Sequence, residues 1–306
     1  MSNSMSIRIG TRASALARWQ ADWVAAQLTE LGAKVDLVLI STQGDVKSGP
    51  IGAIGTQGVF TKELQRALLD DEIDLAVHSL KDLPTDEVLG LSLAAVPPRE
   101  KCGDVLVSNN HDALESLPEK ATVGTGSARR RAQLLHARSD LNVIDIRGNV
   151  DTRLKKLDDG EYDAIILAEA GLTRLGFHDR IRHVLPKEIM LPAIGQGALG
   201  LECRDDDAAT REVVAKLNDE KSHAAVLAER TLLATLRGGC LAPIGAWGRI
   251  EGEQLRLDAV VLDHEGTERL AAGDSGPREE AASLGMEVAQ RLLKSGAGEL
   301  IAQSRE

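Results

Sequence analysis

The chain has 306 residues, of which 43 % are hydrophobic and 27 % are charged, and its formal net charge is −11. This composition excludes global disorder, and the length suits two or three domains of roughly 100 to 150 residues each. The negative charge opposes binding to nucleic acid or to an anionic membrane, and with only 2 % aromatic residues few rings can stack on bases. Anions must therefore be bound by locally concentrated Arg and Lys.

The ends of the chain and its cysteines indicate the compartment. Residues 1–6 are polar without an apolar signal segment, and no stretch reaches the roughly 20 apolar residues that cross a bilayer. We therefore expect a cytoplasmic protein. The cysteines Cys102, Cys203 and Cys240 lie far apart and form no CxxC motif, so neither a disulfide framework nor a metal site is predicted.

The first part of the chain has a βαβαβ order. Strands are expected at 7–9, 35–40, 75–78 and 91–96, and helices at 16–31 and 61–69, from the spacing of apolar residues. The glycine-rich segment 41–58 is longer than an ordinary connection, which indicates a functional or mobile loop. This alternation predicts an α/β fold with a mostly parallel sheet and helices on both faces, where ligands collect at the carboxyl ends of the strands.

A second α/β run begins near Asp104 and ends near Pro192. Its strands are expected at 105–108, 122–123, 143–146 and 164–167, with helices starting at Ser127 and Val150. A strand ending at Cys203 then returns to the first domain. The remainder is expected to form a small α/β domain, with helices at 224–236 and 277–293 around strands 244–250, 255–262 and 268–272. The predicted boundaries are 1–98 with 194–218, then 99–193, then 219–306.

Arginines follow three successive strands of the second run. Thr125, Ser127, Arg129 and Arg130 open a helix after a glycine-rich turn, where backbone N–H groups, hydroxyls and guanidinium groups bind anions well. The next two strands are followed by Arg147, Gly148 and Arg153, and by Arg174. Any single arginine can instead be a solvated helix residue, which is our interpretation of Arg131 and Lys155, but the set of strand-end arginines predicts an anion site.

The first domain offers a similar pair of strand ends. Arg12 and Ser14 occupy one turn, and Ser79, Lys81 and Asp82 follow a buried strand. Asp82 alone would be interpreted as a helix cap, but beside a cationic pocket it becomes a candidate general acid or charge stabiliser. His78 is interpreted as a packed strand residue.

Two further motifs have competing interpretations. Gly195, Gly197 and Gly200 fit GxGxxG, but a strand follows them instead of the helix that a dinucleotide site requires, so the motif does not indicate NAD binding. Cys240 follows a helix and two glycines on a loop. Such exposure suits a reactive thiol, although position alone leaves its function open.

Six ordered segments resemble the porphobilinogen deaminase (hydroxymethylbilane synthase) family of tetrapyrrole biosynthesis. They are IRIGTRASALA, GVFTKELQRALLDDEIDLAVHSLKDLPT, VGTGSARRRAQL, RGNVDTRLKKLDDGEYDAIILAEAGLTRLG, LPAIGQGALGLECR and AERTLLATLRGGCLAPIG. The resemblance implies two lobes like those of a type II periplasmic binding protein, joined by a hinge, and a small C-terminal α/β domain that carries the cofactor cysteine. It also implies a monomer.

The resemblance further implies the chemistry. Four porphobilinogen molecules condense head to tail on a dipyrromethane cofactor linked through a thioether to Cys240, with loss of ammonia, and hydrolysis releases the linear tetrapyrrole. Asp82 would be the catalytic carboxylate. Asp82 would also contact the cofactor. The other binding residues are those at matching positions: Ser79, Lys81, Thr125, Ser127, Arg129, Arg130, Arg147 and Gly148 for the cofactor, and Arg12, Ser14, Arg147, Arg153, Arg174 and Gln196 for porphobilinogen and the polypyrrole intermediates.

One residue departs from the family pattern, and two other protein classes share some of these features. Gln57 stands in the glycine-rich loop where many members have lysine, so one ionic contact is expected to be a neutral hydrogen bond. A two-lobed solute-binding protein would share the fold but predicts a secretion signal and no covalent adduct. An NAD-dependent oxidoreductase is suggested only by the glycine motif.

Overall fold

The computed structural model describes residues 5–41, 61–239 and 242–304. The chain divides into two compact units, Met1–Arg99 with Ala198–His223 and Glu100–Gly197 with Ala224–Glu306. It therefore passes from one unit to the other after Arg99, Gly197 and His223. The three domain boundaries expected from the sequence stay a prediction.

The first unit is built on a five-stranded sheet of order β2-β1-β3-β10-β4. Its strands are β1 (Ser6–Thr11), β2 (Lys34–Leu39), β3 (Leu75–Ser79), β4 (Leu91–Ala95) and β10 (Leu199–Arg204). The strand that ends near Cys203 thus lies in the first sheet, as expected. It runs antiparallel to β3 and β4, whereas β1 is parallel to β2 and β3, because β10 enters from the other unit instead of through a crossover helix.

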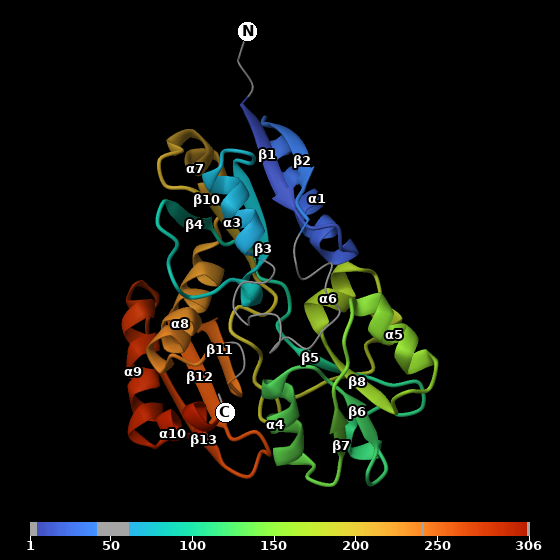
Figure 1. Cartoon of the computed structure of the whole chain (residues 1–306). Coiled ribbons are helices and arrows are strands. Elements are labelled where there is room, and N and C mark those ends of the chain that lie inside the picture. Colours follow the sequence, from blue (N-terminus) through green and yellow to red (C-terminus); the bar gives the residue numbers. More distant parts are fainter. Residues whose placement is uncertain (1–4, 42–60, 240–241, 305–306) are drawn as a thin grey trace. The chain divides into compact units, whose positions relative to one another are not determined.

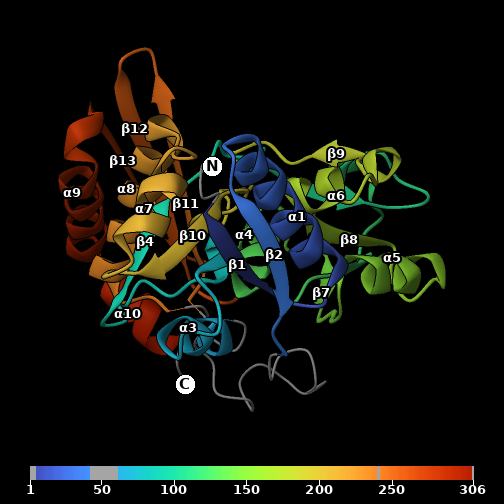
Figure 2. The same cartoon turned by 90° about the horizontal axis from the view of Figure 1, so that it is seen from above.

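Helices cover both faces of this sheet. They are α1 (Ala15–Glu30), α3 (Lys62–Leu69) and α7 (Ala208–Ala215), and a 3₁₀ turn η2 (Leu80–Asp82) follows β3. Because side chains alternate along a strand, Ile7 and Ile9 pack in one cluster with α1 residues. On the opposite face, a Cβ at Gly10 would lie 2.3 Å from Ile73 Cδ1, so a larger residue there would require the Ile73 side chain to shift. Figures 1 and 2 show α1 beside β1 and β2.

The second unit contains a sheet of order β7-β6-β8-β5-β9. Its strands are β5 (Asp104–Val107), β6 (Thr122–Gly124), β7 (Asn142–Ile144), β8 (Ala164–Ala168) and β9 (His183–Val184), and its helices are α4 (Ala128–Ala137), α5 (Val150–Asp158) and α6 (Glu169–Arg174), with 3₁₀ turns at Leu114–Ser116 and His178–Arg180. Strand β5 is antiparallel to β8 and β9, whereas β6 is parallel to β7 and β8. Val123 and Ile166 pack with α4, and Val105 and Ile165 pack with α5.

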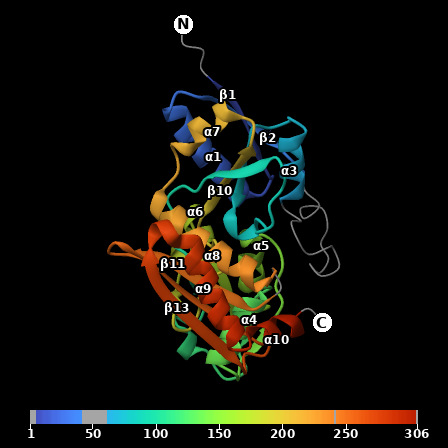
Figure 3. The ribbon, with the colours of Figure 1, turned by 90° about the vertical axis from the view of Figure 1, so that its left-hand side faces the viewer.

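The C-terminal segment adds the small α/β domain that the sequence predicted. It contains α8 (Glu220–Leu236), strands β11 (Ile244–Glu251), β12 (Gln254–Leu262) and β13 (Arg269–Pro277), a 3₁₀ turn η5 (Arg278–Glu280), and helices α9 (Ala281–Lys294) and α10 (Ala297–Gln303). Helix α9 lies along β12 and β13 (Figure 3). On its other face the three-stranded sheet packs Val260 and Leu262 against Ala132 of α4 and against Leu191. Within the described residues, no helix has the length and apolar character to span a membrane.

Candidate active site

The anion site predicted in the second unit lies at the start of α4. Ser127 is the N-cap, and its Oγ accepts a hydrogen bond from the backbone N–H of Arg130 at 3.4 Å. The backbone N–H of Ser127 donates in turn to Thr125 Oγ1 at 3.2 Å. Both hydroxyl oxygens therefore already accept a bond from the backbone, which leaves each hydroxyl hydrogen to donate to an acceptor such as a carboxylate.

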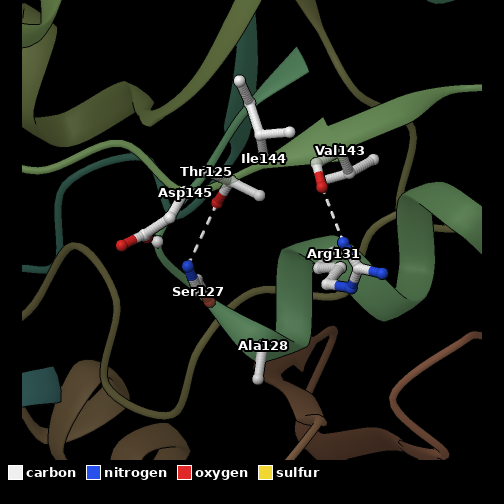
Figure 4. Close-up of a pocket in the computed structure, with 8 residues that line it drawn as sticks. Thr125, Ser127, Ala128, Arg131, Val143, Ile144 and Asp145 are labelled. Atoms are coloured by element: carbon white, nitrogen blue, oxygen red, sulfur yellow. Dashed lines mark hydrogen bonds between the residues drawn. The ribbon is translucent and has the colours of Figure 1, made fainter. Parts of the chain in front are cut away.

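Thr125 and Ser127 belong to a pocket of about 210 Å³ that also involves Arg131 and Asp145 (Figure 4). Arg131 donates through Nη1 to the backbone oxygen of Val143 at 2.6 Å and forms an ion pair of 3.2 Å with Glu265. It is thus a half-exposed residue that joins α4 to neighbouring segments.

Arg129 and Arg130 are buried and share one partner that the sequence analysis did not identify, Asp104. Arg129 donates from Nη1 and Nη2 to the two Asp104 oxygens at 2.7 and 3.2 Å, and Arg130 Nε donates to Oδ1 at 2.8 Å. Arg129 also bonds the backbone oxygen of Leu191, and Arg130 that of Ile166. Two guanidinium groups against one carboxylate leave a net positive charge. We call Asp104, Arg129 and Arg130 the arginine centre.

The pKa values of the arginine centre follow from its burial. Burial alone would raise the pKa of the Asp104 carboxyl, but the charges of Arg129 and Arg130 hold it well below its usual range. Burial lowers the pKa of Arg130, against the opposing effect of Asp104. Asp104 thus remains an anion that fixes the guanidinium groups at neutral pH.

Gln196 and Arg174 meet at the turn formed by residues 195–197, which we call the Gly195 turn. The Gln196 amide donates to the backbone oxygen of Cys102 at 2.9 Å and to Asp104 Oδ1 at 3.1 Å. Arg174 Nη2 donates to the backbone oxygen of Gly197 at 2.7 Å. Burial lowers the pKa of Arg174. The structure therefore brings these two predicted residues together with the arginine centre.

Arg147 and Arg153 lie at the more exposed end of this unit. Arg147 Nε forms a bond of 2.7 Å with Asp145, and Arg153 Nε donates to the backbone oxygen of Gly148 at 2.8 Å. Gly148 has a φ of 114°, and a Cβ there would lie 2.7 Å from Thr152. This turn therefore requires glycine, which places Arg147 and Arg153 on either side of it.

The predicted residues of the first unit lie at the carboxyl ends of β1 and β3. Ser14 caps α1 by accepting the backbone N–H of Ala17 at 3.4 Å. Ser79 exchanges hydrogen bonds of 2.9 and 3.1 Å with Gln20 of α1, a residue that the sequence analysis missed because it falls within the helix pattern. The two adjacent strands are parallel, so these two ends meet at one edge of the sheet.

Asp82 and Lys81 are exposed on η2, directly beyond this edge. The turn is fixed by the backbone, since Leu80 N–H donates to Ala198 O at 3.0 Å and Leu83 N–H donates to Leu80 O at 3.2 Å. His78 just before it is buried, as predicted, and its Nε2 lies 2.9 Å from Glu202 Oε2. An exposed carboxylate on a rigid turn suits proton transfer to a bound ligand.

Some of the predicted residues lie outside the part of the chain that the structure describes, and the remaining predictions concern the other cysteines and metal binding. Cys240, Gln57 and most of the loop 41–58 lie outside them. Cys203 is buried, and burial raises the pKa of its thiol to about 11, whereas Cys102 is partly exposed. Among the residues whose placement the structure describes, His, Cys, Asp and Glu form no cluster of three or more that could hold a metal ion.

Comparison with known proteins decides the family. Residues 7–212 match the family model described as "Porphobilinogen deaminase, dipyromethane cofactor binding domain", and residues 223–294 match its C-terminal domain. The chain belongs to the porphobilinogen deaminase family. Its relatives include the porphobilinogen deaminase of Desulforudis audaxviator, 51 % identical over 97 % of both chains, and that of Pelotomaculum thermopropionicum, 46 % identical over 98 % of this chain and 97 % of the relative.

Porphobilinogen deaminase is hydroxymethylbilane synthase, a transferase of tetrapyrrole biosynthesis, and its cofactor is dipyrromethane. The resemblance, the enzyme class and the cofactor inferred from the sequence are thereby confirmed. Solved structures with partial likeness include the methionine-binding protein MetQ, with 14 % identity, a TM-score of 0.45, and coverage of 69 % of this chain and 89 % of that one.

The residues at the start of α4 fit this cofactor. Dipyrromethane presents acetate and propionate carboxylates, and the first turn of α4 offers unpaired helix N–H groups, two hydroxyls positioned to donate and the net positive charge of the arginine centre. A side chain at Gly126 would crowd this turn, since a Cβ there would lie 2.8 Å from Asp145 Oδ1 and 3.0 Å from the backbone oxygen of Ile146.

Proposed function

We propose that Asp82 is the catalytic acid–base group of this porphobilinogen deaminase and that Cys240 holds the cofactor through a thioether. The observation that carries the assignment of Asp82 is its place on η2, exposed beyond buried β3 and fixed by backbone hydrogen bonds. The bound dipyrromethane supplies the primer to which substrate is joined. Asp82 donates a proton to the amine of the substrate, which leaves as ammonia, and the resulting carboxylate accepts hydrogen bonds from pyrrole N–H groups and stabilises the positive charge that develops on them.

The second part of the proposal concerns the residues that bind the carboxylates of the cofactor and the substrate. In the second unit they are bound by Thr125, Ser127, Arg147, Gly148, Arg153 and Arg174, with Gln196 and the arginine centre beneath them. In the first unit they are bound by Arg12, Ser14, Ser79 and Lys81. Guanidinium and hydroxyl donors suit this ligand, because each added pyrrole brings two more carboxylates that need charge-assisted hydrogen bonds.

Burial refines the roles of Arg129 and Arg130 within this proposal. Both side chains already donate hydrogen bonds to Asp104 and to a backbone oxygen. They therefore contribute to ligand binding through their net positive charge and through the guanidinium N–H groups that these bonds do not use. The side chain of Arg147 is more exposed than those of Arg129 and Arg130, so it can change its position and bind successive carboxylates as the polypyrrole chain grows. We further propose that the protein is a cytoplasmic monomer. We also propose that it binds neither nucleic acid nor an anionic membrane, which its net charge of −11 supports.

Intact-mass measurement tests the assignment of Cys240. Purified active protein is expected to be heavier than its sequence by two linked pyrroles, and Cys240→Ser protein, which cannot form the thioether, is expected to have the unmodified mass and no turnover. Cys102→Ser is the matched control and should keep the added mass. Active protein with an unmodified mass, or an adduct that survives in Cys240→Ser, would refute the assignment.

A further inference from the structure

Glu229 of α8 is a fully buried carboxylate whose two oxygens bind two separate backbone segments. The N–H of Gly195 donates to Oε2 and the N–H of Gly248 in β11 donates to Oε1, each at 2.7 Å. These are short, charge-assisted bonds, and a buried carboxylate requires such partners. Glu229 therefore holds the Gly195 turn to the C-terminal domain.

The Gly195 turn has little freedom to move on its own. Gly195 and Gly197 have φ values of 69° and 85°, a region that favours glycine, and a Cβ at Gly197 would lie 2.4 Å from the backbone oxygen of Glu100. The glycine pattern that resembles a dinucleotide motif in the sequence thus serves a close approach between backbone segments. A displacement at Gly195 is transmitted to the next two residues.

These two residues, Gln196 and Gly197, contact residues that we propose bind the ligand or position the groups that do. Gln196 bonds Asp104 Oδ1 at 3.1 Å and the backbone oxygen of Gly103 at 3.1 Å, and the Gly197 oxygen accepts Arg174 Nη2 at 2.7 Å. One side of the turn is therefore bound by Glu229 and the other by the arginine centre and Arg174.

We propose that Glu229 is a positioning residue for substrate binding: it fixes the Gly195 turn, and through Gln196 and Gly197 it sets the positions of Asp104 and Arg174. This inference rests on the proposed roles of Gln196, Arg174 and the arginine centre. Guanidinium groups bind carboxylates well only when they are held within about 0.5 Å of the required geometry. Loosening the turn therefore weakens binding of the carboxylated substrate, while the chemical step at Asp82 is untouched.

The test is steady-state kinetics of Glu229→Gln, with rates expressed per molecule that carries the cofactor by intact mass. The substitution keeps the side-chain shape but places an NH₂ group against one of the two backbone N–H groups. The KM for porphobilinogen is expected to rise about tenfold, with kcat within about twofold of the unaltered enzyme. Glu253→Gln, which removes an exposed charge from the β11–β12 turn, is the control and should change neither.

A purely structural role predicts a different result. Reduced stability alone lowers the amount of active enzyme and hence the apparent kcat, but leaves the KM of the remaining folded molecules unchanged. An unchanged KM in folded Glu229→Gln would overturn the proposal. Loss of folding in both Glu229→Gln and Glu229→Asp would assign this residue to stability alone and overturn it as well.

A double-mutant cycle tests the route through the turn. If Glu229 acts through Gln196, the KM of the double variant Glu229→Gln/Gln196→Leu should lie well below the product of the two single effects, whereas independent sites combine multiplicatively. Multiplicative effects would overturn the route. Failure of the proposed function itself is recognised separately, since the unaltered enzyme would then lack the adduct or fail to convert porphobilinogen.

Discussion

Asp82 combines an exposed carboxylate with a fixed backbone. The backbone N–H of Leu80 donates to the oxygen of Ala198, and the N–H of Leu83 donates to the oxygen of Leu80. Asp82→Asn retains the shape of the side chain but loses its ability to exchange a proton. We expect folded protein that still carries the cofactor, with kcat lowered about 100-fold or more. Stopped assays of product formation and intact mass measure the two properties. Asp86→Asn, an exposed residue of the same loop, should be near normal, and near-normal turnover of Asp82→Asn would remove Asp82 from the chemistry.

We expect the arginine centre to affect both stability and ligand binding. Arg130→Gln leaves a buried anion with fewer partners, which should lower the free energy of unfolding by about 3 kcal/mol. It should also impair assembly of the cofactor, because the net positive charge near Thr125 and Ser127 is lost. Urea unfolding and intact mass check these effects. Arg131→Gln, which affects a half-exposed ion pair, is the control. A fully modified Arg130→Gln protein would contradict the role in cofactor assembly.

At the scale of an element, helix α4 has two functions in its first turn. Ser127 caps the helix, and in the proposed function its hydroxyl also donates a hydrogen bond to a carboxylate of the ligand. Asp and Asn are both good N-caps, so Ser127→Asp and Ser127→Asn should keep the stability of the helix to within about 0.5 kcal/mol. Only Ser127→Asp adds a negative charge beside the bound carboxylates, and we expect it alone to lose the cofactor. Thermal unfolding and intact mass compare the pair, and equal cofactor content in both would exclude this contact.

The sequence predicted some of the helices and strands and not others. The strand ends that carry Arg12, Asp82 and Ser127 were predicted because apolar runs that stop at Gly, Ser or Thr mark the carboxyl edge of a sheet. Helices α6, α7 and α10 are six to eight residues long and were missed. Helix α3 is as short but was predicted, because its buried residues Leu64, Ala67 and Leu68 recur at helical spacing. The antiparallel direction of β5 and β10 depends on which unit each strand enters from, which local pattern does not encode.

The residues of the candidate site likewise include some that the sequence predicted and some that it did not. Arginines after successive strands could be found because each follows an apolar run, and the structure places Arg129 and Arg130 together on α4. Asp104 and Glu229 were missed, because a single acid at the start of a strand or within a helix is usually solvent-exposed. Their roles arise from tertiary packing, which brings each acid to donors far away in the sequence.

At the scale of the whole molecule, Asp74 ties distant parts of the first unit together and should affect its unfolding in acid. Its carboxylate accepts bonds from Arg8 of β1 at 2.7 Å and from Arg204 of β10 at 3.1 Å. Burial alone would raise the pKa of Asp74, but the bonds from Arg8 and Arg204 lower it to about 2. The ionised form therefore stabilises the fold at any pH above the ordinary value of 3.8, and this contribution is lost as the pH falls toward 2.

Asp74→Asn removes that contribution at every pH. The variant should be less stable than the unaltered protein at pH 7, and the difference should shrink as the pH falls from about 4 to about 2, because the unaltered protein then loses the same interaction. Urea unfolding at a series of pH values, with Asp22→Asn on the exposed side of α1 as the control, measures the difference. A gap between the two proteins that stays constant through this range would show that Asp74 is not the group whose protonation weakens the first unit.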